Sequence, residues 1–162
     1  TFNTNIYVCL TGGLIVKGSL RFYFFTLHYL FSGRSDEGLS DRVQLKPCKK
    51  LPCALKKGKD QHITIKFTPE KEISDVKNSV SADVFGVNVP FVGVDGISIC
   101  DKITLESGDK ASCPLAAGTT YVYKDSFPIL SFYPNIHVKV HWALHHGKNE
   151  LVCFEVPASI VG

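Results

Sequence analysis

The chain has 162 residues, of which 44% are hydrophobic and 20% charged. It is long enough for one domain with its own core and too short for two ordinary domains. The formal net charge of +3 is mild, which argues against a dedicated nucleic-acid binder. The longest apolar run, residues 22–31, is too short to span a bilayer and is interrupted by Thr26 and His28. We therefore expect one compact soluble domain.

The first 40 residues differ in character from the rest of the chain and allow two interpretations. One is a variant secretory leader, because residues 20–33 place an arginine before an aromatic-rich apolar run that ends in small residues. The other is a pair of strands, over residues 6–10 and 20–31, joined through a turn at Gly12 and Gly13. Periodicity does not separate these two interpretations.

From residue 41 to residue 162, short alternating segments bounded by turn formers predict an all-β domain. The expected strands are residues 42–47, 62–67, 79–91, 119–129, 136–144 and 150–161. Strands of this length and spacing are typical of a β-sandwich or barrel. We expect a bulge at Phe85 and Gly86, where the alternation changes phase, and a hairpin tip at His145 and His146.

Alternation within three of these strands assigns the side that faces the core. The inward residues are Ile63, Ile65, Phe67, Ile136, Val138, Val140, Trp142, Val152, Phe154 and Val156. His137 and His141 then lie on the solvent face of their strand. A packed core accounts for the inward set without any ligand.

The six cysteines are Cys9, Cys48, Cys53, Cys100, Cys113 and Cys153. An even number with close pairs favours disulfides, and therefore an oxidising compartment. A zinc site built from the middle four is the alternative, although their spacing is unusual for a zinc knuckle. No motif places a nucleophile, a base and oxyanion donors together, so we expect no enzyme, no metal and no cofactor.

Six lysines surround the first cysteine pair, namely Lys46, Lys49, Lys50, Lys56, Lys57 and Lys59. Such a run is ordinarily a solvated loop. The alternative is a contact with anionic lipid head groups, in which Lys56, Lys57 and Lys59 would touch the membrane.

Over roughly residues 41–161 the chain resembles the ML (lipid-recognition) domain family. The resemblance rests on the segments PCKKLPCALKKG, ITIKFTPEKEI, GVNVPFVGVDGISIC, CPLAAGTTYVYKDSFPIL, YPNIHVKVHWAL and VCFEVPASIV, in this order. Each motif alone is weak, and their combination is specific. The resemblance implies an immunoglobulin-like β-sandwich of two antiparallel sheets with a lipid cavity between them.

The family pattern also implies roles for individual residues. It pairs Cys48 with Cys53 and Cys100 with Cys113. It ties Cys153 to an N-terminal cysteine, for which Cys9 is the candidate unless residues 1–40 are a leader and Cys153 stays free. The mouth of the cavity falls on Phe91, Tyr133 and Pro134. The cavity wall falls on Ile63, Ile65, Phe67, Val89, Tyr123, Ile129, Ile136, Val138, Trp142 and Phe154.

The function implied by the resemblance is a monomeric, soluble carrier that binds a sterol or another apolar lipid. Its partners would be that lipid and an anionic membrane surface or a sterol-accepting membrane receptor, and its location the outside of the cell or the endosomal and lysosomal lumen. The alternatives are an extracellular carrier of fatty acids or semiochemicals and a lipid-presenting immune co-receptor. We also expect Phe91→Ala to weaken binding with little effect on melting.

Overall fold

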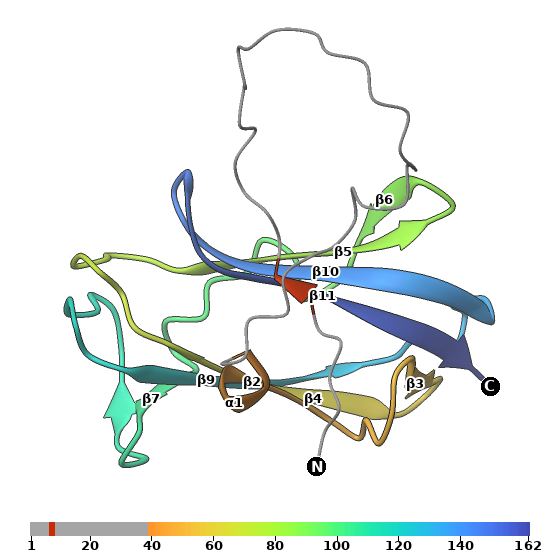
Figure 1. The fold of residues 1–162 in the computed structure, drawn as a ribbon, viewed down its shortest axis with the longest axis horizontal. Coiled ribbons are helices and arrows are strands. Elements are labelled where there is room, and N and C mark those ends of the chain that lie inside the picture. The colour runs from red at the N-terminus through yellow and green to blue at the C-terminus, as the bar shows by residue number, and fades with distance from the viewer. Residues whose placement is uncertain (1–6, 9–38) are drawn as a thin grey trace, which may run out of the picture.

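The computed structural model describes residues 7–8 and 39–162 of the chain. Over these residues the protein is a β-sandwich, in which two sheets are stacked face to face with the core between them (Figure 1). The helix α1 (Leu39–Arg42) is a single turn that leads into the first strand of the main domain. Among the described residues, no helix is both long and apolar enough to cross a membrane. The all-β prediction is confirmed.

Each sheet has its own strand order. Sheet A runs β1 (Tyr7–Val8), β11 (Asn149–Val161), β10 (Ile136–His146), β5 (Lys77–Val84) and β6 (Val87–Pro90), with β3 (Cys53–Lys56) also paired to β11. Sheet B runs β2 (Val43–Lys46), β4 (Asp60–Phe67), β9 (Tyr121–Pro128), β7 (Ile103–Leu105) and β8 (Lys110–Ala111). The pairing of β3 with β11 is parallel, and the other described strand pairs are antiparallel.

The alternation of apolar and polar residues places the core as predicted. Ile63, Ile65 and Phe67 of β4 are buried, and so are Trp142 of β10 and Phe154 of β11. Successive side chains of a strand point to opposite faces, so each of these strands gives its apolar side to the space between the sheets. Burial of these large side chains from water is the main force that holds the two sheets together.

The expected bulge at Phe85 and Gly86 is wrong, because these two residues form the turn of a hairpin. Val84 of β5 pairs with Val87 of β6, which leaves a loop of only two residues. Both loop residues have positive φ angles, 52° at Phe85 and 82° at Gly86, as the tight turns that suit the twist of a hairpin require. The predicted strand over residues 79–91 is therefore two strands.

The sequence also places the last hairpin tip two residues too early. His145 and His146 still belong to β10, where they pair with Glu150 and Asn149 of β11. The turn itself follows at Gly147, and the register shift in this hairpin lies between Leu144 and His145. Strands β3, β7 and β8 are not predicted at all, since two to four residues are too few to show alternation.

The disulfides Cys48–Cys53 and Cys100–Cys113 are present as the family pattern implies, so the zinc alternative is wrong for these four residues. Cys153 is also disulfide-bonded, so the alternative in which it stays free is wrong. Cys9 lies outside the described residues, and its pairing with Cys153 stays a prediction. Of the two strands expected before residue 40, the first contains β1, and the second lies outside the described residues, as does the leader alternative.

A chain of buried hydrogen bonds crosses the core from sheet A to sheet B. Trp142 Nε1 donates to Asn78 Oδ1 at 3.1 Å, and Asn78 Nδ2 donates to the hydroxyl oxygen of Tyr123 at 2.9 Å. The Tyr123 hydroxyl donates to Asp125 Oδ2 at 2.8 Å, and Lys102 neutralises that carboxylate at 2.9 Å. Burial raises the pKa of Tyr123 far above its usual value, so its hydroxyl stays protonated and remains a donor.

Replacing Asn78 should destabilise the sandwich strongly. Asn78→Ala leaves the Trp142 indole N–H without its partner in a buried site, and we expect urea unfolding to show a loss of about 2–3 kcal/mol. Asn88→Ala, at an exposed position of β6, is the matched control and should change stability by less than about 0.5 kcal/mol. Equal effects of the two substitutions would contradict a structural role for the hydrogen-bond chain.

Candidate functional site

An apolar cavity lies between the two sheets, with a volume of about 20 Å³. Its lining comes from both sheets and from β3. The lining residues are Leu45, Cys53, Leu55, Gln61, Phe91, Phe127, Val140, Trp142, Phe154, Val156 and Ala158. Apart from the indole N–H of Trp142, the polar side chain in this lining is that of Gln61. The amide nitrogen of Gln61 donates a hydrogen bond to Pro47 O at 3.4 Å. The wall of this cavity is therefore apolar almost throughout.

Aromatic rings fill most of the space around this cavity. Phe127 contacts Phe91 at a centroid distance of 5.7 Å and Trp142 at 5.5 Å. Trp142 in turn stacks on Phe154 at 6.5 Å with an interplanar angle of 4°. Pockets that hold small molecules have volumes of roughly 300–1,000 Å³, so this cavity admits a lipid only when the rings move and the sheets separate.

The three predicted mouth residues are close together. The rings of Phe91 and Tyr133 meet edge to face at a centroid distance of 6.1 Å, and Pro134 follows in an exposed position. Phe91 is only 7% exposed, so Phe91→Ala removes core contacts and should lower melting, contrary to the expectation from sequence. Tyr133 is half-buried, and this partial burial raises the pKa of its hydroxyl.

The predicted wall residues divide into four groups. Trp142 and Phe154 line the cavity, and Ile136 is half-buried. The buried core outside the cavity lining contains Ile63, Ile65, Phe67, Tyr123, Ile129 and Val138. Val89 does not face the interior: it is 45% exposed, because β6 is an edge strand whose four residues are all exposed.

The sequence missed several residues that do line the cavity. Phe127 lies on the same face of β9 as Tyr123, so alternation alone would have found it. Val140 and Val156 were predicted to point inward but were not assigned to the wall. Leu55 belongs to β3, which was not predicted, and Gln61 carries no apolar signal.

Exposed apolar side chains lie beside two of the predicted mouth residues and at the tip of the β5–β6 hairpin. Val92 follows Phe91 in the chain, and Phe132 contacts the ring of Tyr133 at 5.2 Å while remaining 75% exposed. Phe85 at the tip of the β5–β6 hairpin is 91% exposed, and Val87 beside it is also exposed.

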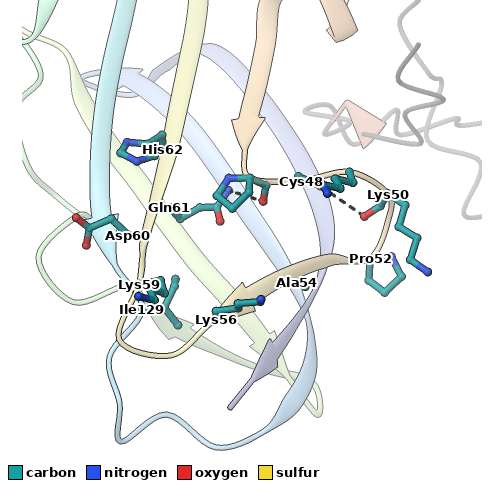
Figure 2. Close-up of a pocket in the computed structure, with 12 residues that line it drawn as sticks. Cys48, Lys50, Pro52, Ala54, Lys56, Lys59, Asp60, Gln61, His62 and Ile129 are labelled. Carbon is teal, nitrogen blue, oxygen red and sulfur yellow. Dashed lines mark hydrogen bonds between the residues drawn. The ribbon is translucent and has the colours of Figure 1, made fainter.

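A second, larger pocket of about 660 Å³ lies on the outside of the molecule. Figure 2 shows it between the loop that carries Cys48 and Lys50 and the segment from β3 to β4 that carries Lys56 and Lys59. We call it the lysine pocket, and its lining residues are Pro47, Cys48, Lys49, Lys50, Pro52, Ala54, Lys56, Lys59, Asp60, Gln61, His62 and Ile129. Of the three predicted membrane-contact lysines, Lys56 and Lys59 line it and Lys57 does not.

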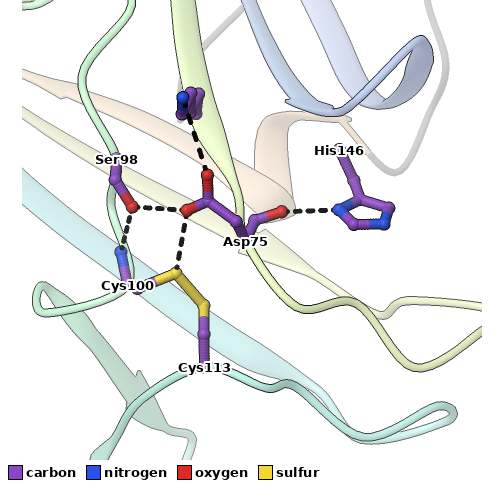
Figure 3. Close-up of a disulfide and its surroundings, with 6 residues drawn as sticks. Asp75, Ser98, Cys100, Cys113 and His146 are labelled. Atoms are coloured by element: carbon purple, nitrogen blue, oxygen red, sulfur yellow. Dashed lines mark hydrogen bonds and ion pairs between the residues drawn. A yellow bond between two sulfur atoms is a disulfide. The ribbon is translucent and has the colours of Figure 1, made fainter.

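A polar cluster at the Cys100–Cys113 disulfide brings together a serine, an aspartate and a histidine (Figure 3). Ser98 Oγ donates to Asp75 Oδ1 at 2.6 Å, whereas the His146 ring donates from Nδ1 to the backbone carbonyl of Asp75 at 2.8 Å. The histidine therefore does not contact the serine and cannot act as its base in this arrangement. The cluster anchors the loop around the disulfide to the β10–β11 hairpin.

The chain matches known proteins over most of its length. The ML domain family matches residues 33–160. Among curated relatives, "NPC intracellular cholesterol transporter 2" of Canis lupus familiaris is 32% identical over 126 residues, covering 77% of this chain and 79% of the relative. "Ecdysteroid-regulated 16 kDa protein" of Manduca sexta is 31% identical and covers 67% of this chain and 70% of the relative.

A solved structure has the same fold. The Niemann-Pick type C2 protein from Japanese carpenter ant superimposes with a TM-score of 0.63 at 22% sequence identity, covering 74% of this chain and 89% of that chain. Together with the sandwich, the two disulfides and the apolar space between the sheets, the family match leads to one conclusion: this chain belongs to the ML domain family.

Proposed function

We propose that this protein is a soluble carrier that binds a lipid, with a sterol as its cargo, between its two sheets. The observation that carries the proposal is the apolar, aromatic-lined cavity between the sheets of an ML domain. Curated relatives at 30–32% identity are named as cholesterol transporters, which supports a sterol as the cargo. This site provides a ligand with a fitting shape and an apolar surface. The proposed activity is therefore the binding and release of a lipid.

Binding requires the sheets to part at the cavity. The hydrogen bonds of Asn78 tie sheet A to sheet B on one side of Trp142, and the apolar cavity lies on the other side. Apolar contacts have no preferred direction. The contact between the rings of Phe91 and Phe127 can therefore be replaced by contacts of each ring with a lipid. A sterol of roughly 28 heavy atoms at about 0.3 kcal/mol per atom would bind with a dissociation constant of roughly 1 μM.

The polar end of the cargo would remain at the mouth. Burying a hydroxyl without a partner costs roughly 1–3 kcal/mol, and the cavity wall has few polar groups: Gln61, whose amide nitrogen donates to Pro47 O, and the Trp142 indole, which donates to Asn78. The phenol of Tyr133 and the solvent beside Pro134 are available to such a hydroxyl at the mouth.

Transfer of the cargo requires the mouth to meet a membrane or a receptor. The exposed side chains of Phe85, Val92 and Phe132 would contact the apolar part of the bilayer. Lys56, Lys57 and Lys59 are proposed to contact its anionic head groups. The disulfides fit an oxidising compartment, so we place the protein outside the cell or in the endosomal and lysosomal lumen.

Energy transfer from Trp142, the single tryptophan, to dehydroergosterol tests the cargo directly. Trp142 lines the cavity, so bound sterol should quench its emission to saturation at roughly micromolar concentration, and a fatty acid should not displace the sterol. Absence of transfer together with tight uptake of the fatty acid would instead support a carrier of fatty acids or semiochemicals. Binding of bacterial glycolipid in preference to both would support a lipid-presenting co-receptor.

Two neighbouring aromatic residues provide the matched variants for this titration. Tyr133→Ala removes an edge-to-face contact at the mouth and should weaken sterol binding about fivefold to tenfold. Phe132→Ala removes a side chain that is exposed to solvent, and affinity should stay within about twofold. The mouth assignment is wrong when both variants bind sterol as the unmodified protein does.

Salt should slow delivery of sterol to anionic vesicles. The Debye length shrinks from about 10 Å at 0.1 M salt to about 3 Å at 1 M, which screens attraction between the lysines and the acidic head groups. We expect the transfer rate to fall severalfold over this range for anionic vesicles and to change little for neutral ones. A rate to anionic vesicles that does not depend on salt would count against a membrane contact through Lys56, Lys57 and Lys59.

A further inference from the structure

The lysine pocket is built by two segments that the fold holds at fixed positions. The Cys48–Cys53 disulfide closes the loop on one side. On the other side, the β3–β4 turn is anchored by backbone hydrogen bonds from Lys57 N to Val161 O at 2.9 Å and from Gly58 N to Ile129 O at 2.6 Å. The concave shape therefore rests on a covalent bond and on main-chain contacts, and the lysines are mounted on its rim.

The charges around this pocket are not balanced within the described part of the chain. Four ammonium groups line it, from Lys49, Lys50, Lys56 and Lys59, against the single carboxylate of Asp60. None of these four lysines forms an ion pair with a described residue. Elsewhere on the surface, four lysines do form ion pairs, namely Lys66, Lys77, Lys102 and Lys139. An external anion is the natural counter-charge for such a group of cations.

The floor of the pocket is apolar, in contrast to its rim. We use the term floor for its four apolar lining residues, Pro47, Pro52, Ala54 and Ile129. A site that joins a cationic rim to an apolar floor suits a ligand with both characters, which is an anionic amphiphile. An inorganic anion alone would leave the apolar part unused.

This pocket is separate from the cavity between the sheets. The two share Gln61 as a lining residue, and the Cys48–Cys53 disulfide presents one cysteine to each. Gln61 is only 2% exposed, and its contact with Pro47 O closes the wall between them. A ligand in the lysine pocket would thus leave the space between the sheets free for cargo.

We propose that the lysine pocket binds the phosphate head of a single-chain anionic lipid, with the first part of its chain on the apolar floor. Several ammonium groups on flexible side chains can surround a phosphate, which offers oxygen acceptors in several directions. The inference rests on the proposed function in that the ligand is a lipid, and it shares Lys56 and Lys59 with the proposed membrane contact. It adds a second site with a different ligand chemistry from that of the cargo site.

Decyl phosphate, used below its micelle-forming concentration, is the probe for calorimetric titration at low salt. The test variant is Lys56→Gln/Lys59→Gln. The control is Lys110→Gln/Lys148→Gln, which removes the same charge from exposed lysines that do not line the pocket. Melting curves should be the same for all three proteins, because the four substitutions are at exposed positions.

We expect decyl phosphate to bind the test variant about tenfold more weakly than the unmodified protein, and the control within about twofold of it. Inorganic phosphate should bind at least about tenfold more weakly than decyl phosphate, since it lacks the chain. The neutral detergent decyl maltoside should not distinguish the three proteins. Protein saturated with dehydroergosterol should keep its affinity for decyl phosphate.

Several results would overturn the inference. Equal losses in the test and control variants, or no loss in either, would show that this pocket is not an anion site. Inorganic phosphate binding as tightly as decyl phosphate would make it a site for free phosphate. Displacement of decyl phosphate by dehydroergosterol would show that the two share one site.

The cargo titration on the same three proteins separates this inference from the proposed function. Saturable energy transfer from Trp142 together with lysine-independent binding of decyl phosphate would refute the second site alone. Lysine-dependent binding of decyl phosphate without any energy transfer would refute the sterol cargo alone.

Discussion

The hydrogen bonds of Asn78 join the two sheets through the middle of the core, and the rest of the interior is organised around them. One amide oxygen accepts from the indole of Trp142 in sheet A, and the amide nitrogen donates to Tyr123 in sheet B. An unpaired polar group in this buried position would cost free energy, so these hydrogen bonds fix the distance between the two sheets at Asn78. On the cavity side of Trp142 the contacts are apolar and do not fix the distance between the sheets.

In the proposed function, this difference between the two sides of Trp142 is what would allow a closed sandwich to take up a lipid. On the apolar side, rings contact one another around a cavity of about 20 Å³ and can be replaced by another apolar body. On the polar side, the sheets stay connected. A carrier of the proposed kind would therefore open at one end and keep its fold, without a permanently empty cavity that exposes apolar walls to water or leaves a void in the core.

The sequence was sufficient for the features that depend on local pattern. Alternation found the core face of β4, β10 and β11, whereas the pairing of the cysteines in the two disulfides came from the family resemblance. Prediction from sequence failed where one or two residues determine whether a strand continues or turns. A two-residue turn at Phe85 and Gly86 looks like a change of phase within one strand, and Val89 is exposed in β6, which is the last of the described strands in its sheet.

The site depends on contacts between distant segments, which is why so little of it could be read from the sequence. The cavity lining includes Leu55 from β3, a strand of four residues that is stabilised by parallel pairing with the far end of the chain. The lysines were recognised as a cluster, but that four of them line a pocket follows only from the positions of the disulfide loop and the turn between β3 and β4. Asn78 gave no signal, since a polar residue in a strand is ordinarily on the solvent face.

The most direct test of this account is the nuclear magnetic resonance signal of the Trp142 indole N–H, which is unique because the chain has one tryptophan. On saturation with dehydroergosterol, the signal should shift strongly, since the ring lines the cavity. The proton should nevertheless remain protected from exchange with solvent, since its hydrogen bond to Asn78 is on the side that stays closed. A signal that does not move at saturation would show that the sterol does not bind between the sheets, and rapid exchange would show that the sheets separate on the polar side as well.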